Sequence, residues 1–208
     1  MADMSKPESL LFASNNRHKA EEINSILGDH FKITTLAEEG IIIDIPEPHD
    51  TIAANAEEKS AVIYQLTGKN CFGEDTGLEV EALGGAPGVK SARFAGEKAT
   101  AGENLAKLQE LMKGQANRNA RFVTVISLRL NGQHFSFTGI CPGTIAEKPS
   151  GTEGFGYDPL FIPDGSEKSF ADMTLTEKNQ FSHRKKAVEK MVDLLKQFSK
   201  GKNSLDQN

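Results

Sequence analysis

The stretch Cys71-Phe72-Gly73-Glu74-Asp75-Thr76-Gly77 places two adjacent carboxylates and a hydroxyl directly after small and apolar residues. This pattern is typical of a strand that ends by presenting acids to a cleft. Because neighbouring side chains of a strand point to opposite faces, Glu74 and Asp75 share a cleft only if the strand ends there, and Gly77 permits that turn. The stretch therefore predicts Asp75 at the mouth of a cleft, handling a divalent metal or a water. The alternative is a solvated acidic turn.

Length, charge and cysteine content limit the class of protein. At 208 residues the chain is long enough for one sizeable core, which two lobes could share. The net charge of −5 argues against broad nucleic-acid binding, although it permits a local basic pocket for one anion. Cys71 and Cys141 have no metal or redox spacing, so we expect buried, reduced thiols in a cytoplasmic protein. The polar residues 1–9 are no signal peptide, and no apolar run approaches the ~20 residues of a membrane span.

The N-terminal part of the chain reads as strand, polar loop and helix. The apolar run 10–13 predicts a buried strand, and it stops at Ser14-Asn15-Asn16-Arg17-His18-Lys19. Apolar residues then recur at helical spacing to Leu27, and Gly28 is expected to end the helix. This arrangement aims backbone N–H groups and a helix dipole at an anion, and Arg17 and Lys19 add positive charge. The loop is a candidate phosphate cradle, with an ordinary Asn turn as the alternative.

Most other elements follow from hydrophobic periodicity and turn residues. We expect strands at 31–35, 41–45, 78–82 and 122–130 and helices at 51–66, 100–112 and 182–198. Asp50 is the expected N-cap of the second helix, and Gly68 closes it. Asn131-Gly132 predicts a type I′ hairpin turn.

Two later motifs are unusual for a core. Three glycines flank Phe155 within residues 151–159, which suits a flat ligand stacked on the ring or, alternatively, a mobile loop anchored by a buried Phe. Ser182 is a good N-cap, so His183 and Arg184 fall in the first turn of the last helix. Cations are electrostatically disfavoured there, and this conflict indicates an anionic or carbonyl-bearing partner.

The charged residues that lie near strand ends, prolines, loops or helix starts form an acidic and a basic group. The acids are Glu47, Glu74 and Asp75, and the bases are Arg17, Lys19, Lys178, His183 and Arg184. Acids that bind a divalent metal, facing bases that bind phosphates, describe a polyphosphate cleft. With Phe155 as a surface for a base, the residues indicate a nucleotide phosphohydrolase.

The sequence resembles the inosine triphosphate pyrophosphatase family. The resemblance is carried, in the family's order, by residues 14–19, 73–77, 83–88 with 91–93, 154–159 and 182–184. It implies an α/β fold in which a long mixed β-sheet with flanking helices forms two lobes around a central cleft. It also implies a single domain over residues 1–208, with a core at 10–198 and a disordered tail at 201–208, and a homodimer.

The resemblance further implies hydrolysis of ITP, dITP and XTP to the monophosphate and pyrophosphate, which cleanses the nucleotide pool. Asp75 would be the catalytic proton acceptor, and Mg²⁺ would be held by Asp75 and Glu47, with Glu74 acting through water. Many bacterial members have Asp where this chain has Glu74, so the role of Glu74 is open. The substrate would be bound by Ser14, Asn15, Asn16, Arg17, His18, Lys19, Thr76, Phe155, Gly156, Tyr157, Asp158, Lys178, His183 and Arg184.

Within this set, Lys19 and the neighbouring amides would hold the phosphate tail, Phe155 would stack on the purine, and His183 and Arg184 would donate to its 6-oxo group. Two alternatives remain open. One is a pyrophosphatase for other modified nucleotides on a related scaffold, and the other is a nucleotide-binding protein without turnover. We expect no nucleic-acid or membrane partner.

Overall fold

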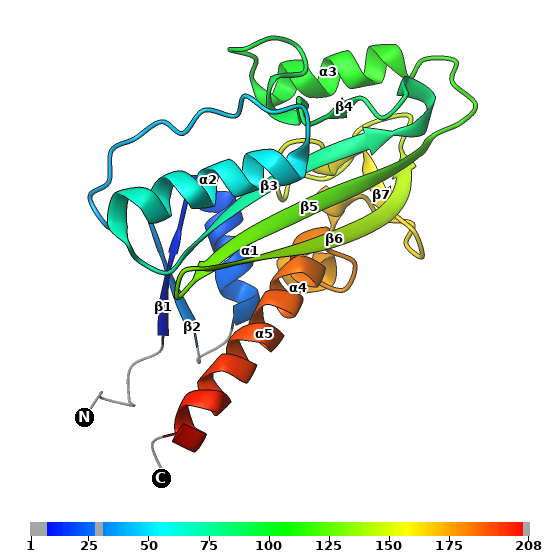
Figure 1. Ribbon diagram of the computed structural model, residues 1–208. Helices are drawn as coiled ribbons and strands as arrows, with labels where there is room; N and C mark the ends of the chain where they lie inside the picture. Colours follow the sequence, from blue (N-terminus) through cyan, green and yellow to red (C-terminus); the bar gives the residue numbers. More distant parts are fainter. Residues whose placement is uncertain (1–7, 28–30, 206–208) are drawn as a thin grey trace.

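The computed structural model describes residues 8–27 and 31–205, and its centre is a mixed sheet of seven strands (Figure 1). The strand order is β2-β1-β3-β5-β6-β7, and β4 pairs with β3. β1 is parallel to β2 and β3, whereas the other pairs are antiparallel. The strands are β1 (Glu8–Phe12), β2 (Phe31–Thr35), β3 (Cys71–Val80), β4 (Pro87–Gly88), β5 (Asn119–Leu130), β6 (Gln133–Ile145) and β7 (Phe161–Pro163).

Helices cover both faces of this sheet. They are α1 (Arg17–Leu27), α2 (Ile52–Thr67), α3 (Ala101–Leu111), α4 (Leu175–Lys178) and α5 (His183–Leu205), with 3-10 turns η2 (Glu81–Leu83), η3 (Ser91–Arg93), η4 (Asp158–Leu160) and η5 (Phe170–Asp172). Along β5, Val123 and Val125 pack with α2, whereas Ile126 and Leu128 share a core with α1 and α5. Because alternate side chains of a strand face opposite ways, α2 and α5 lie on opposite faces. β1 and β2 lie at one end of the long strands and α3 at the other (Figure 1).

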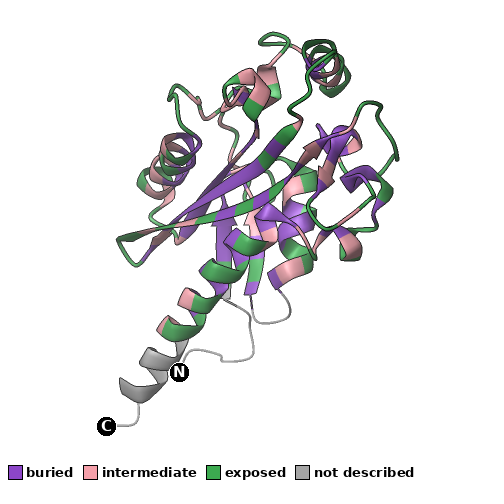
Figure 2. Cartoon of the chain, turned by 90° about the vertical axis from the view of Figure 1, so that its right-hand side faces the viewer, coloured by how far each residue is buried: buried purple, intermediate pink, exposed green. Residues whose placement is uncertain are grey.

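The buried core consists of two main clusters along the sheet, and buried residues run along the long strands in Figure 2. One cluster joins β1, β2 and α1 to α5, and the other joins the far ends of β3 and β5 to β7 and the turns around it. Long strands run through both clusters, so the two lobes share one sheet. This is the predicted α/β fold.

The acidic stretch does not end a strand, so the predicted turn at Gly77 is wrong. β3 continues through it, and its ladder with β5 runs from Cys71 opposite Arg129 to Val80 opposite Ala120. The glycine serves close packing instead, because a Cβ on Gly77 would lie 2.4 Å from the carbonyl oxygen of Gly88. Consequently Glu74 and Asp75 point to opposite faces of the sheet.

Residues 41–45 are also not a strand, although they alternate like one. Ile41, Ile43 and Ile45 pack against a small core cluster, but the segment pairs with no strand of the described residues. Residues 41–50 form a strap without regular secondary structure. The N-cap of α2 is Thr51, whose hydroxyl accepts from the amide of Ala54, and not the predicted Asp50.

Several local predictions are confirmed. Asn131 and Gly132 both have positive φ values, 51° and 80°, as a type I′ turn requires. Gly68 caps α2 in the left-handed region. Both cysteines are free and buried, and burial raises the pKa of each thiol to about 12.

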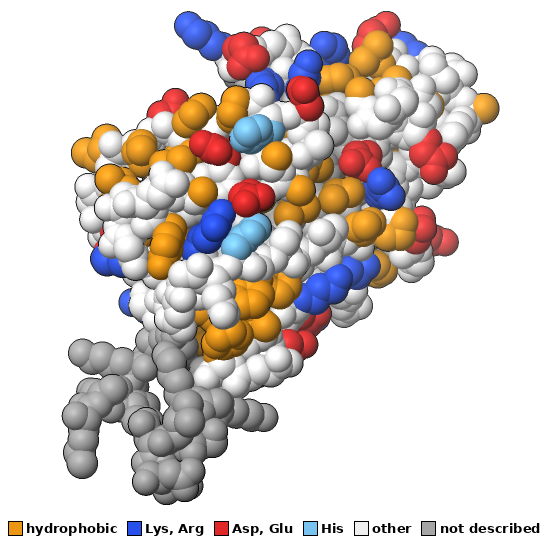
Figure 3. Space-filling view, in the orientation of Figure 1, with side chains coloured by type: hydrophobic (Ala, Val, Ile, Leu, Met, Phe, Trp, Pro, Cys, Tyr) orange, Lys and Arg blue, Asp and Glu red, His pale blue; other side chains and the backbone are white. Residues whose placement is uncertain are grey.

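The remaining predictions concern the ends of the chain, a membrane span and a basic surface. The backbone of residues 201–205 continues α5, while the predicted cap Gly28 and residues 206–208 lie outside the described part. None of the described helices combines the length and apolar character that a bilayer crossing requires. On the face shown in Figure 3, acidic and basic side chains are interspersed and do not gather into a basic stripe.

Candidate active site

A cavity of about 620 Å³ brings most of the predicted site residues together. It is lined by Ala13, Ser14, Asn15, Asn16, His18, Lys19, Leu36, Ile43, Asp44, Ile45, Glu47, Lys59, Asp75, Thr76, Val89, Ser91, Ala92, Ala101, Asn104, Phe122, Phe155, Gly156, Tyr157, Asp158, Lys178, His183 and Arg184. Two predicted residues, Arg17 and Glu74, do not line it.

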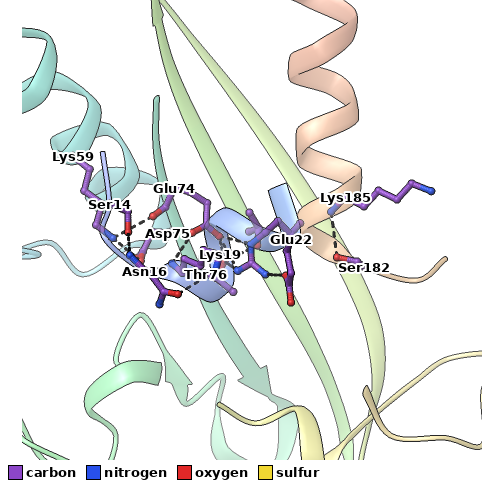
Figure 4. Close-up of polar contacts among 12 residues, drawn as sticks. Ser14, Asn16, Lys19, Glu22, Lys59, Glu74, Asp75, Thr76, Ser182 and Lys185 are labelled. Atoms are coloured by element: carbon purple, nitrogen blue, oxygen red, sulfur yellow. Dashed lines mark hydrogen bonds and ion pairs between the residues drawn. The ribbon is translucent and has the colours of Figure 1, made fainter. Parts of the chain in front are cut away.

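The loop between β1 and α1 forms one wall of the cavity, and its own side chains hold it in shape. The Ser14 hydroxyl accepts from the amide of Asn16, and the Asn16 side chain accepts from the amide of Lys19 in the first turn of α1 (Figure 4). The side-chain oxygen Oδ1 of Asn15 accepts from the amide of Ala37. The loop thus presents the N-terminus of α1, where amides and the helix dipole favour an anion.

Asp75 lies on the α2 side of the sheet in a group of alternating charges. The ammonium of Lys59 lies 3.0 Å from Asp75 Oδ1 and 2.5 Å from Glu47 Oε1, and it also donates to the main-chain carbonyl of Glu74. Asp75 Oδ2 is buried and has no hydrogen-bond partner among the described residues. A buried carboxylate oxygen without a donor is costly, so this oxygen is suited to hold a water or a cation.

Lys59 was not among the predicted site residues, although the sequence carries a signal for it. In α2 it lies on the same stripe as Ile52, Ala56 and Ile63, which are buried. A lysine on the core-facing stripe of a helix needs a charged partner. The partners come from β3 and from the strap, and only the folded chain brings them together.

Glu74 lies on the opposite face and is completely buried. Its carboxylate is 2.6 Å from Lys19 Nζ and 3.1 Å from Arg184 Nη2, and it also accepts from the Thr76 hydroxyl. Glu74 therefore joins the loop wall of the cavity to the start of α5.

Phe155 and the residues around it form another part of the cavity. The ring of Phe155 stacks on His18 at 5.3 Å between centroids, and Lys178 Nζ lies 5.4 Å from the Phe155 centroid. Asp158 Oδ2 accepts from the Phe155 amide at 2.9 Å and from Lys178 at 2.7 Å. The glycine-rich loop is thus anchored through Asp158, with an aromatic face at the cavity.

Glu22 of α1 is a second residue that sequence reasoning missed. It is buried and accepts from Lys178 Nζ at 2.7 Å and from Arg184 Nη1. With Glu74 on the other terminal nitrogen, both Nη atoms of Arg184 have carboxylate partners, whereas Nε has no hydrogen-bond partner among the described residues.

Burial and neighbouring charges set the protonation states. Burial raises the pKa of Asp75, and the facing Lys59 and Lys19 offset part of that rise. Burial also opposes ionisation of Glu47, but the ammonium of Lys59 outweighs it and holds the pKa of Glu47 below its ordinary value. Burial, reinforced by Arg184, keeps the pKa of His183 well below its ordinary value, so the imidazole is neutral.

The described side chains alone do not build a complete metal cage. Within residues 8–27 and 31–205, no three acidic, histidine or cysteine side chains are grouped so as to hold a metal ion. Mg²⁺ is usually bound through one or two carboxylates together with substrate phosphates and waters. Asp75, with its unpartnered oxygen, and the nearby Glu47 fit that kind of site.

Comparison with known proteins gives consistent matches over nearly the whole chain. The model of the Ham1 family matches residues 10–194. A dITP/XTP pyrophosphatase of Flavobacterium johnsoniae is 48% identical over 186 residues, covering 89% of this chain and 97% of that protein. One of Porphyromonas gingivalis is 49% identical over 190 residues, covering 90% and 97%.

Solved structures agree in fold. The Ham1 protein of Staphylococcus aureus matches with a TM-score of 0.82 at 33% identity, covering 91% of this chain and 98% of that one. A HAM1 protein of Coxiella burnetii matches with a TM-score of 0.83 at 34% identity, covering 91% and 99%.

Proposed function

Since the chain belongs to the Ham1 family, we propose that it is a nucleoside triphosphate pyrophosphatase that acts on non-standard purine nucleotides such as dITP and XTP. The predicted enzyme class and family resemblance are confirmed by these relatives. The observation that carries the assignment to this chain is one cavity lined by Asp75, Glu47 and Lys59 and also by Phe155 and His183. It offers acids and cations for a triphosphate and an aromatic face for a base.

The reaction adds water to the α-phosphorus of the triphosphate and breaks its bond to the α,β-bridging oxygen, giving a monophosphate and pyrophosphate. The start of α1 and Lys19 bind the phosphates. Asp75 Oδ2 is the unpartnered buried oxygen in the cavity, so it accepts the proton of the attacking water. Lys59, 3.0 Å from the other oxygen, lowers the pKa of Asp75 against the effect of burial, favours its ionised form and fixes its orientation.

Mg²⁺ is the cofactor that would suit these residues, and Asp75 and Glu47 would be its carboxylate ligands. When bound with the substrate, it supplies charge neutralisation on the phosphate oxygens. Glu74 does not line the cavity and is paired with Lys19 and Arg184, which favours a positioning role over the predicted metal contact.

Base selection rests on donors at the Phe155 end of the cavity. The neutral imidazole of His183 has one N–H to donate, and its Nδ1 has no hydrogen-bond partner among the described residues. A 6-oxo purine accepts such a bond, whereas the 6-amino group of adenine leaves a buried donor unpaired at a cost of about 1–3 kcal/mol per group. Lys178 and Arg184 hold this end in place through Glu22.

A panel assay tests the proposal. We expect pyrophosphate release from dITP, ITP and XTP to exceed that from dATP and ATP by about 10²-fold or more, because unpaired buried donors penalise the amino purines. Pyrophosphate and orthophosphate are measured separately, with Mg²⁺ or with EDTA. Equal rates on all purines, preference for modified pyrimidines, or nucleotide binding without turnover would each contradict the proposal.

The expected homodimer and cytoplasmic location belong to the same proposal. Light scattering, which measures the molar mass in solution, tests the homodimer.

The pH profile gives a second test, of Lys59. Catalysis needs ionised Asp75, so kcat/KM falls as the pH falls through the Asp75 pKa, which burial has raised and Lys59 partly lowers. Lys59→Met removes the positive charge that lowers the pKa of Asp75. The low-pH fall in kcat/KM (the acid limb) should therefore move to higher pH. Lys69→Met, which breaks an exposed pair with Glu39, serves as the control and should leave the limb in place. An unmoved limb in Lys59→Met would show that Asp75 is not the titrating base.

A further inference from the structure

The second lobe is the one built around the second core cluster, which includes the far ends of β3 and β5, β7 and the turns around it. Arg93 connects this second lobe to the strap that carries Glu47. Its Nη1 lies 3.2 Å from Glu47 Oε2, and its Nη2 donates to the main-chain carbonyl of Glu47 at 3.3 Å. One planar guanidinium thus holds both the side chain and the backbone of the same residue. The more distant Glu97, 3.8 Å from Arg93 Nε, is largely exposed.

The strap depends on such contacts because it lacks regular secondary structure. At its start the amide of Ile41 donates to the carbonyl of Leu36, and at its end His49 exchanges two hydrogen bonds with the buried side chain of Asn55. Between these two anchors, Arg93 fixes the strap at Glu47.

Arg93 extends from a well-fixed platform. It ends η3, where the hydroxyl of Ser91 donates to the carbonyl of Gly88 and accepts from the amide of Leu78. The carbonyl of Ser91 accepts from Tyr157, and that of Ala92 accepts from Asn104. The base of the Arg93 side chain is therefore held by β3, α3 and the Phe155 loop.

The contact continues into the catalytic group. Glu47 Oε1 lies 2.5 Å from Lys59 Nζ, which lies 3.0 Å from Asp75 Oδ1. Arg93, Glu47, Lys59 and Asp75 form a line of alternating charges that runs from the second lobe to β3. Without Arg93, Glu47 would keep Lys59 as its ionic partner but would lose the contact that fixes its backbone.

We propose that Arg93 is a positioning residue that holds Glu47, across the lobes, in the place from which it binds the divalent cation. This inference rests on the proposed function. Loss of a partner that orients a metal ligand typically lowers metal affinity about 10- to 100-fold. Arg93 would therefore set the affinity for Mg²⁺ without affecting which base is accepted.

The test compares Arg93→Gln and Arg93→Lys with the unaltered protein. The concentration of free Mn²⁺ is followed by electron paramagnetic resonance in the presence of a dITP analogue with an α,β-imido bridge. We expect Arg93→Gln to weaken Mn²⁺ binding at least about tenfold. Arg93→Lys should weaken it less than Arg93→Gln does, because an ammonium keeps an ionic contact with the Glu47 carboxylate. It should still weaken Mn²⁺ binding, because one ammonium cannot bridge the side chain and the carbonyl. The half-saturating Mg²⁺ concentration for pyrophosphate release should rise in parallel, while the dITP-to-dATP preference is unchanged.

Hydrogen exchange supplies a readout that does not depend on activity. The two hydrogen-bonded amides at the ends of the strap, those of Ile41 and His49, should exchange faster in Arg93→Gln than in the unaltered protein. Arg121→Gln is the matched control, since it breaks an Arg–Glu pair with Glu79 at the protein surface and should change neither readout.

The outcomes are distinct. Unaltered or tighter Mn²⁺ binding in Arg93→Gln would overturn the proposal, and so would absence of Mn²⁺ binding by the unaltered protein. If Arg93→Gln does not fold, unaltered Mn²⁺ affinity in Arg93→Lys would overturn it. Failure of the unaltered protein to release pyrophosphate while Mn²⁺ binding still depends on Arg93 would refute the proposed function alone.

Discussion

Replacing Asp75 by Asn should lower kcat for pyrophosphate release about 10²- to 10⁴-fold, the range that loss of a general base produces. The substitution keeps the shape and the size of the side chain but removes the acceptor for the proton of water. Nucleotide affinity should remain within a few fold, because the start of α1, Lys19 and Phe155 are untouched. Single-turnover rates with dITP and calorimetry with the α,β-imido analogue measure the two effects separately.

Asp193→Asn is the matched control, since Asp193 is exposed on α5 outside the cavity. It should leave both quantities unchanged. Turnover in Asp75→Asn within tenfold of the unaltered rate would remove Asp75 from the mechanism. Equal loss of turnover and nucleotide binding would instead indicate that Asp75 acts mainly in binding.

Replacing Glu74 by Gln should destabilise the protein by about 3–5 kcal/mol, the usual effect of removing one partner from a buried ion pair. Glu74 is completely buried and pairs with Lys19 and Arg184 on two different helices. Burial opposes its ionisation, but those two cations outweigh burial and keep its pKa well below the ordinary value. Urea unfolding measures the change in the free energy of unfolding.

The same variant separates a positioning role from a metal role. If Glu74 positions Lys19 and Arg184, Glu74→Gln should raise KM for dITP and leave the half-saturating Mg²⁺ concentration unchanged. Glu79→Gln, which breaks a surface pair with Arg121, should cost less than about 1 kcal/mol. A raised Mg²⁺ requirement with unchanged stability would show that Glu74 serves the metal.

Hydrophobic periodicity and turn residues predicted much of the fold, because each helix or strand can be recognised from its own residues. Three features were predictable because their structure depends only on residues nearby in the chain. They are the β5–β6 hairpin with its turn, the cap of α2 at Gly68 and the polar loop before α1. The predicted strand at residues 41–45 is wrong, because alternation shows which side chains face the core but does not show whether a partner strand is present.

The acidic stretch shows the limit of that reasoning at the site. The sequence alone singled out Asp75 and Glu74 and, through the family resemblance, the chemistry. It did not determine that β3 runs straight through them and sends the two carboxylates to opposite faces. That outcome depends on pairing with β5, where the partners of Glu74 and Asp75 are Ile126 and Val125, much further along the chain.

What the sequence by itself determined was, through the family resemblance, the α/β class, together with most of the helices and strands and most of the chemical groups at the site, although not Lys59 or Glu22. Only the tertiary structure decided how those groups are shared: Asp75 with Lys59 and Glu47, and Glu74 with Lys19 and Arg184. The reason is physical. A buried charge pairs with an opposite charge on the segment that packs against it. Which segment packs there depends on contacts between residues far apart in the chain.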